Sequence, residues 1–138
     1  MKLFLSLLFS ATFVFASTAF IELKELPELI IKTDTVLLDT TDLKTFKKGH
    51  IPSAINVDAS KFRKQVGPYQ LMKSPEEIQK LIRALGINNN SRVVIYGHNK
   101  TKEILKAGYI ALSLITNGFT NISILDGGYT EWIEEYED

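Results

Sequence analysis

Short apolar runs that do not alternate with polar residues are the feature that most constrains the fold of this chain. Residues 35–39 and 92–96 are such runs, rich in valine, leucine and isoleucine. Strands with this pattern are buried on both faces, as in parallel sheets. Residues 55–57 and 121–125 are two further short strand candidates. Because helical segments separate these runs, we predict an α/β domain with a mainly parallel sheet.

The helical segments carry boundary signals as well as apolar periodicity. Ser74 stands three residues before Glu77, which predicts a capped helix start. An apolar stripe at helical spacing follows and is closed by Gly86: Ile78, Leu81, Ile82 and Leu85. The segment from about 103 to 117 is apolar nearly all round, so we predict a central, buried helix there. Residues 58–72 show no clear period and are expected to be mostly loop.

Residues 1–19 have the pattern of a secretory signal peptide. Lys2 supplies a positive start, residues 3–15 are mainly apolar, and small residues follow up to Ala19. We therefore expect a signal peptide at 1–19, one domain at 20–138, and a periplasmic or secreted location. Since no charged residue occurs between residues 3 and 21, an uncleaved membrane anchor is the alternative.

Composition excludes several classes of function. The chain has no cysteine, so thiolate chemistry and disulfides are both excluded. Its 16 basic and 16 acidic residues balance, and no basic cluster is dense enough to predict nucleic-acid binding. Only 2 histidines occur, without ligand spacing around them, so we predict no metal site. No cofactor motif is present, and we expect no cofactor.

Three segments together resemble the rhodanese domain family. The first is the strand ending at Asp39 with the Gly-His-Ile-Pro segment that follows it, and the second is the strand at 93–96. The third is the Gly-Phe-x-Asn ending at 118–128 with the tryptophan after it. The motif residues are Asp39, Gly49, His50, Ile51, Pro52, Asp126, Gly127, Gly128 and Trp132. The resemblance covers the chain from about residue 20 to residue 132.

This resemblance implies a five-stranded, mainly parallel sheet flanked by helices on both faces. Active family members carry sulfur as a persulfide on a loop cysteine, which backbone N–H groups surround. The position of that cysteine is occupied here by Gly97, and the arginine that commonly follows Asp39 by two residues is replaced by Thr41. The segment from Gly97 to Gly118 is also a few residues longer than we expect for cysteine-bearing members. These departures are similar to the cysteine-less N-terminal domain of tandem thiosulfate sulfurtransferases.

The loop after the strand at 93–96 is the candidate ligand site, because ligands of parallel sheets bind at the carboxyl ends of the strands. An anion-binding loop is one interpretation, with two lysines, polar side chains and a helix N-terminus. Its residues are Gly97, His98, Asn99, Lys100, Thr101 and Lys102. The other interpretation is a loop whose polar residues are only solvated. For His50, Asp39 and Trp132 a structural role is favoured over a catalytic one.

We therefore expect an exported rhodanese-like domain that acts as a binding or regulatory module, or as one half of a sulfurtransferase. Although the family is one of sulfurtransferases, we do not expect activity from this chain alone. The alternative is a protein that binds thiosulfate or another small oxyanion and acts with a cysteine-bearing partner domain. The expected partners are such a domain or another periplasmic protein. We expect no contact with nucleic acid, and none with a membrane after signal cleavage.

Overall fold

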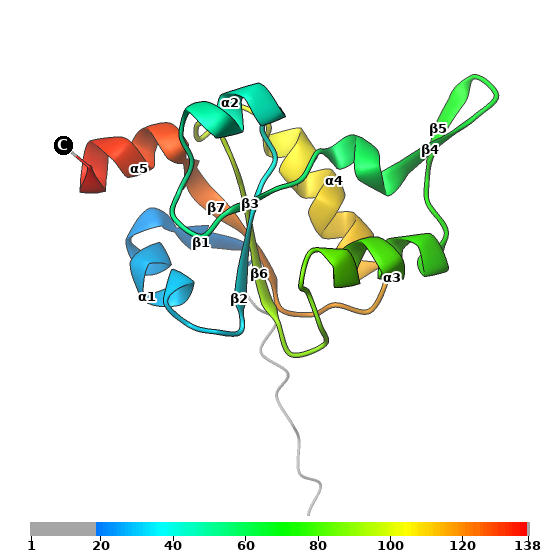
Figure 1. The fold of residues 1–138 in the computed structure, drawn as a ribbon, viewed down its shortest axis with the longest axis horizontal. Helices are drawn as coiled ribbons and strands as arrows, with labels where there is room; N and C mark the ends of the chain where they lie inside the picture. Colours follow the sequence, from blue (N-terminus) through cyan, green and yellow to red (C-terminus); the bar gives the residue numbers. More distant parts are fainter. Residues whose placement is uncertain (1–18, 138) are drawn as a thin grey trace, which may run out of the picture.

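The computed structural model describes residues 19–137, which form one five-stranded sheet with helices on both faces (Figure 1). All five strands are parallel, in the spatial order β1-β7-β6-β2-β3. Their bounds are Phe20–Glu22 (β1), Thr35–Asp39 (β2), Ile55–Asn56 (β3), Arg92–Gly97 (β6) and Ile122–Gly128 (β7). The predicted α/β class and the five-stranded parallel sheet are confirmed. Residues 1–18 of the predicted signal segment lie outside the described part of the chain.

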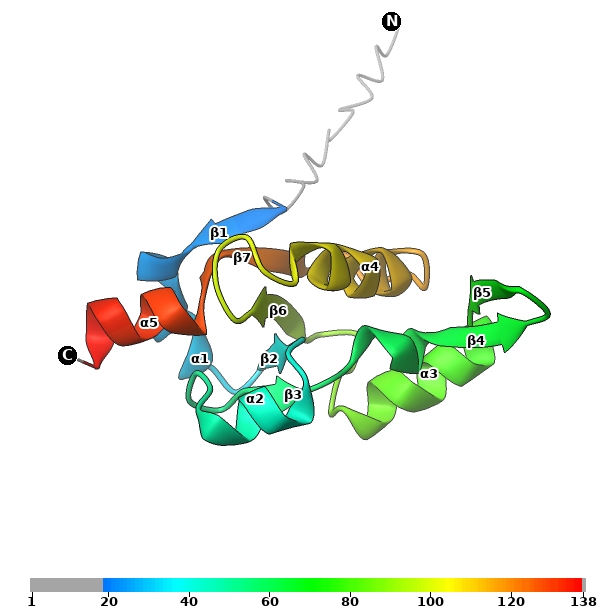
Figure 2. The same cartoon turned by 90° about the horizontal axis from the view of Figure 1, so that it is seen from above.

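The helices form two layers, one on each face of the sheet. Their bounds are Leu23–Glu25 (η1) and Ala59–Phe62 (η2) for the 3-10 helices, and Leu26–Ile30 (α1), Leu43–Lys48 (α2), Pro75–Ala84 (α3), Ile104–Ile115 (α4) and Tyr129–Tyr136 (α5) for the α-helices. Helices α3 and α4 cover one face, and α1 and α5 cover the other (Figure 2). Within residues 19–137, no helix is long and apolar enough to cross a membrane.

The two central strands are buried on both faces, as their unbroken apolar sequences predict. In β2, Leu38 packs in the core beneath α3 and α4, whereas Leu37 packs in the core beneath α1 and α5. In β6, Ile95 and Val94 divide in the same way, and each of them is fully buried. Two hydrophobic cores therefore share one sheet.

Helix α3 begins as the sequence predicts. The Ser74 side chain accepts from the Glu77 N–H at 3.4 Å, and the Glu77 carboxylate accepts from the Ser74 N–H at 2.9 Å. These reciprocal bonds satisfy two of the N–H groups that a helix start leaves unpaired. Ile78 and Ile82 then point into the core and are fully buried.

Two predictions about local structure are wrong. Residues 58–72 are not mostly loop, because they contain η2 and an antiparallel hairpin formed by β4 (Arg63–Val66) and β5 (Tyr69–Met72). Helix α4 is not buried all round, since Leu105 is 86% exposed and Leu112 is 52% exposed. The helix lies on the outside of the sheet and buries only the side that carries Ala107, Ile110 and Leu114.

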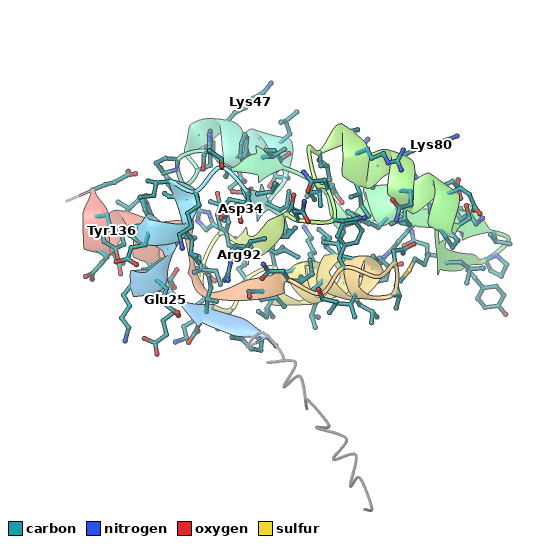
Figure 3. The ribbon with its side chains drawn as sticks, turned by 90° about the horizontal axis from the view of Figure 1, so that it is seen from below. Glu25, Asp34, Lys47, Lys80, Arg92 and Tyr136 are labelled. Carbon is teal, nitrogen blue, oxygen red and sulfur yellow. The ribbon has the colours of Figure 1, made fainter. Side chains whose placement is uncertain are left out.

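The parallel strands give the molecule two unlike ends. At the amino ends, the Arg92 N–H donates to the carbonyl of Asp34, and both residues lie near the middle of that end (Figure 3). At the carboxyl ends, Asp39 pairs in register with Tyr96, and the loop after β6 crosses the top of the sheet. The predicted site residues gather at this second end.

Candidate functional site

A pocket lies at the carboxyl ends of the strands, between α2 and the loop that connects β6 to α4. Its volume is about 270 Å³. It is lined by Asp42, Thr45, Lys48, Gly49, His98, Lys102, Glu103 and Tyr129. Three of these residues belong to the predicted loop or to the predicted motif, namely Gly49, His98 and Lys102. The parallel topology therefore brings the motif and the loop together at one place.

Gly97, the last residue of β6, has no room for a side chain. A Cβ atom built on it would lie 2.6 Å from the Lys102 carbonyl oxygen and 2.9 Å from the Glu103 Cβ. Real Cβ atoms essentially never approach other atoms within 3.0 Å. A cysteine at this position would therefore require the loop backbone to move.

The backbone N–H groups of the loop point at acceptors of the chain itself. The Glu103 carboxylate accepts from the His98 N–H at 2.8 Å, and the Glu131 carboxylate accepts from the Lys100 N–H at 2.9 Å. The Asn99 side-chain oxygen accepts from the N–H groups of the two residues before Glu103, at 3.2 and 2.7 Å. Two carboxylates thus occupy donors of the kind that an anion-binding loop offers to its ligand.

The two lysines of the loop have different surroundings. The Lys100 ammonium forms an ion pair with Asp126 at 3.1 Å. Lys102 instead lines the pocket together with Lys48, and neither has a carboxylate within ion-pair distance among residues 19–137. The prediction that Gly97 to Lys102 binds an anion stays a prediction, and the structure directs it to Lys102 rather than to Lys100.

His98 connects the loop to the start of α5 through hydrogen bonds with Thr130. Its carbonyl accepts from the Thr130 N–H at 2.9 Å and from the Thr130 hydroxyl at 3.1 Å. The imidazole Nδ1 is buried without a hydrogen-bond partner in the described part of the chain. Glu103 is the residue that precedes α4, and its backbone is left-handed with φ +60°. Its carboxylate accepts the hydrogen bond from the His98 N–H.

Asp39 is buried at the end of β2 and belongs to a hydrogen-bonded network. Its carboxylate accepts from the Thr41 N–H at 2.8 Å and from the Thr41 hydroxyl. The Tyr96 hydroxyl accepts from the Ile51 N–H at 3.0 Å. Burial, followed by the influence of the Asp39 carboxylate, raises the pKa of Tyr96 far above its ordinary value. Thr41, at the position where the family commonly has an arginine, thus donates two hydrogen bonds to Asp39.

The Gly-His-Ile-Pro segment forms the turn after α2. The His50 Nδ1 donates to the Phe46 carbonyl at 2.9 Å, and its ring stacks on the Phe46 ring with centroids 3.8 Å apart. Gly49 lies directly against the Tyr129 hydroxyl, so it leaves space for that side chain. Ile51 is fully buried in the core, whereas Pro52 is exposed.

The second glycine motif brings β7 against the loop. A Cβ on Gly128 would lie 2.6 Å from the Asn99 Cα, so only glycine allows this approach. Gly127 has φ +152°, a conformation that side chains disfavour. Trp132 is buried in the core, and its indole N–H donates to Glu137 at 3.0 Å. Trp132 therefore packs away from the pocket.

Sequence reasoning did not assign six residues to this site: Asp42, Thr45, Lys48, Glu103, Tyr129 and Glu131. Glu131 lies on α5, and no local pattern connects it to a loop near residue 100. Glu103 carried a weak signal, because an acidic residue at a helix start can accept backbone N–H groups. Among residues 19–137, no three histidine, aspartate or glutamate side chains gather as a metal site requires.

Comparisons with known proteins agree on one family. A family model described as Rhodanese-like domain matches residues 22–135. A putative thiosulfate sulfurtransferase from Synechococcus elongatus is 33% identical over 91 residues, which are 64% of this chain and 28% of that protein. The sulfur carrier protein TtuD from Thermus thermophilus is 31% identical over 121 residues, 79% of this chain and 41% of that protein. The chain therefore spans less than half the length of either relative.

Solved structures show the same fold at low identity. The crystal structure of YnjE has a TM-score of 0.72 at 20% identity and covers 85% of this chain and 29% of that one. The human single domain sulfurtransferase TSTD1 has a TM-score of 0.62 at 20% identity, with coverage of 86% of this chain and 98% of that one. The domain resembles a complete single-domain structure as well as parts of longer chains.

Proposed function

Because the chain belongs to the rhodanese-like domain family and contains no cysteine, we propose that it is a non-catalytic member that binds a protein partner. A persulfide carrier needs a thiolate, and the sulfur atoms of this chain belong to 2 methionines. The partner is a cysteine-bearing sulfurtransferase domain or another exported protein. The site of action is the periplasm or the outside of the cell, after removal of residues 1–19.

The packing around Gly97 is the observation that carries this proposal. The Lys102 carbonyl and Glu103 fill the space that a side chain at this position needs. The carboxylates of Glu103 and Glu131 occupy two N–H groups of this loop, and in active members the corresponding loop surrounds the sulfur. The chain thus lacks the cysteine, and its own side chains and backbone fill the loop where the sulfur would be held. This packing supports a role other than sulfur transfer.

Sulfur transfer from thiosulfate to cyanide tests the non-catalytic role directly. We expect the purified protein to match the reaction without protein. We also expect Gly97→Cys to stay inactive, because the new side chain collides with the closed loop. Turnover by the unmodified protein at rates typical of active sulfurtransferases is the result that rejects the proposal.

A second candidate function is the binding of a small oxyanion in the pocket, in concert with a cysteine-bearing partner domain. The observation that favours it is the pair Lys48 and Lys102, which line the pocket without an ion pair among residues 19–137. The name of the Synechococcus relative, a putative thiosulfate sulfurtransferase, supports a sulfur oxyanion as the ligand.

Calorimetric titration with thiosulfate, sulfite and phosphate tests this second candidate. Oxyanion binding in the pocket should be lost in a Lys48→Ala, Lys102→Ala double variant. Lys100→Ala is the matched control, because Lys100 pairs with Asp126 and does not line the pocket. The candidate is rejected if none of the three anions binds, or if the double variant binds as tightly as the unmodified protein.

A further inference from the structure

The β4–β5 hairpin projects from the body of the domain, beyond α3 and α4 (Figures 1 and 2). Its cross-strand pairs are Arg63 with Met72, Lys64 with Leu71, Gln65 with Gln70, and Val66 with Tyr69. Because side chains alternate between the faces of a strand, Lys64, Val66, Tyr69 and Leu71 share one face. The other face carries Arg63, Gln65, Gln70 and Met72.

The face that carries Arg63 and Met72 turns toward the body. The Arg63 guanidinium lies 3.8 Å from the centroid of the Tyr109 ring of α4, and the Met72 sulfur accepts from the Thr116 hydroxyl at 3.7 Å. Met72 also packs against the core beneath α4. The opposite face, which we call the outer hairpin face, therefore points away from that core.

Apolar side chains are exposed on the outer hairpin face. On the outer hairpin face Tyr69 is 68% exposed, Leu71 is 48% exposed and Val66 is 45% exposed. Gln65 and Gln70 share the other face with Arg63 and Met72 and are exposed as well. A hairpin that is solvated in its working state keeps its apolar residues on the covered face, so three clustered apolar side chains on the outer face indicate a contact surface.

The hairpin region is also cationic and has open strand edges. Residues 59–75 contain four basic residues and no acidic residue, the basic ones being Lys61, Arg63, Lys64 and Lys73. Lys64 forms an ion pair with Glu77 of α3 at 3.5 Å, and neither Lys61 nor Lys73 has a carboxylate within ion-pair distance among residues 19–137. Within residues 19–137, β4 and β5 pair only with each other, so each strand has an outer edge with unpaired main-chain groups. Such an edge is a template for another strand.

We propose that the outer hairpin face and an open edge of the hairpin bind an extended, acidic segment of a partner protein, with apolar side chains set against Val66, Tyr69 and Leu71. The main chain of the segment pairs with the open edge, and its carboxylates face the cationic side chains. This inference rests on the proposed binding role and names the surface and the chemistry of the partner.

Charge and backbone chemistry favour this occupant over two others. Two hairpins from two copies of the chain would bring the positive charges of residues 59–75 together, which disfavours a symmetric dimer through this face. An anionic membrane satisfies the charge and the apolar side chains, but lipid cannot pair with a strand edge. A polypeptide satisfies all three features.

Selection of short random peptides displayed on phage against the immobilised protein tests the proposal. We expect enriched peptides to be acidic, with apolar residues at alternate positions. A Tyr69→Ser, Leu71→Ser double variant should bind the selected peptides at least about tenfold more weakly. The control variant, Gln65→Ser with Gln70→Ser, changes the other face of the same strands and should retain their affinity.

The remaining results overturn the proposal. They are failure to enrich any peptide, enrichment of basic peptides, or equal affinity of the Tyr69 and Leu71 variant. Binding to phosphatidylserine vesicles or self-association that is lost in that variant assigns the face to lipid or to a second copy instead. Circular dichroism must show that both variants are folded. Sulfur transfer is measured separately, so failure of this inference is distinct from failure of the non-catalytic role.

Discussion

At the scale of single residues, Gly97 is the position where the loop is most sensitive to change. Gly97→Ala places a methyl group against the Lys102 carbonyl and Glu103. We expect overpacking of this kind to lower the free energy of unfolding by about 1–3 kcal/mol. Urea denaturation followed by circular dichroism measures it.

Gly108 is the matched control for this substitution. A Cβ on Gly108 meets nothing within 4 Å, and the residue lies inside α4. Gly108→Ala is therefore expected to leave stability unchanged or to raise it by up to about 1 kcal/mol, because alanine favours the helix. Equal effects of the two substitutions would mean that the loop accommodates a side chain at Gly97 without strain.

The Tyr96 hydroxyl is the second residue-scale test, because it is buried and accepts from the Ile51 N–H at 3.0 Å. Tyr96→Phe leaves the buried Ile51 N–H without this acceptor, and we expect a loss of about 1–3 kcal/mol in the free energy of unfolding. Tyr69→Phe, on the exposed hairpin, should cause no measurable loss. Wild-type stability in Tyr96→Phe would show that the bond between the Tyr96 hydroxyl and the Ile51 N–H contributes nothing to folding.

At the scale of elements, the start of α3 gives a pH-dependent prediction. The Ser74 N–H and hydroxyl, followed by Lys64, lower the pKa of Glu77 below its ordinary value of 4.5. A carboxyl with a lowered folded-state pKa stabilises the protein above its unfolded pKa and loses that contribution as the pH falls through the folded pKa. Glu77→Gln should therefore be less stable than the wild type at neutral pH, and the difference should shrink as the pH falls below 4.5.

Denaturation midpoints of the wild type and Glu77→Gln across this pH range measure the effect. Glu76→Gln is the control, since Glu76 lies in the same helical turn without a bond to the Ser74 N–H. A difference between wild type and Glu77→Gln that does not shrink as the pH falls below 4.5 would assign the effect to shape rather than to charge.

Elements with local signals were predictable from the sequence, and elements stabilised by distant contacts were not. The caps of α3 and the two-sided burial of β2 and β6 follow from residues within each element. The hairpin was missed because its strands are short, largely exposed and mostly polar on the side that faces the body. Its position depends on contacts of Arg63 and Met72 with α4, which lie about forty residues away in the sequence.

The same division applies to the candidate site. Gly97, His98 and Lys102 were placed at the carboxyl ends of the strands because parallel topology requires it. Closure of the loop was not predictable, since it depends on Glu131 from α5 and on the left-handed conformation of Glu103. Whether a loop binds a ligand or its own side chains is decided by such tertiary contacts.

At the scale of the whole molecule, the two hydrophobic cores share one sheet and should unfold together. Leu114 is fully buried on the α4 side, and Leu26 is fully buried on the α1 side. We expect Leu114→Ala and Leu26→Ala each to lower the free energy of unfolding by about 2–5 kcal/mol. Because the two residues lie on opposite faces of the sheet, their effects should add to within about 0.5 kcal/mol in the double variant, provided it still folds.

The single tryptophan makes this coupling measurable. Trp132 reports on the core beneath α1 and α5, whereas far-ultraviolet circular dichroism reports on all helices. If the cores are coupled, Leu114→Ala shifts the urea transition of Trp132 fluorescence although the substitution lies on the other face, and the two signals change at the same midpoint. If Trp132 fluorescence keeps its wild-type transition while circular dichroism shifts, the layers unfold independently. The shared strands β2 and β6, buried on both faces, are the physical reason to expect one transition.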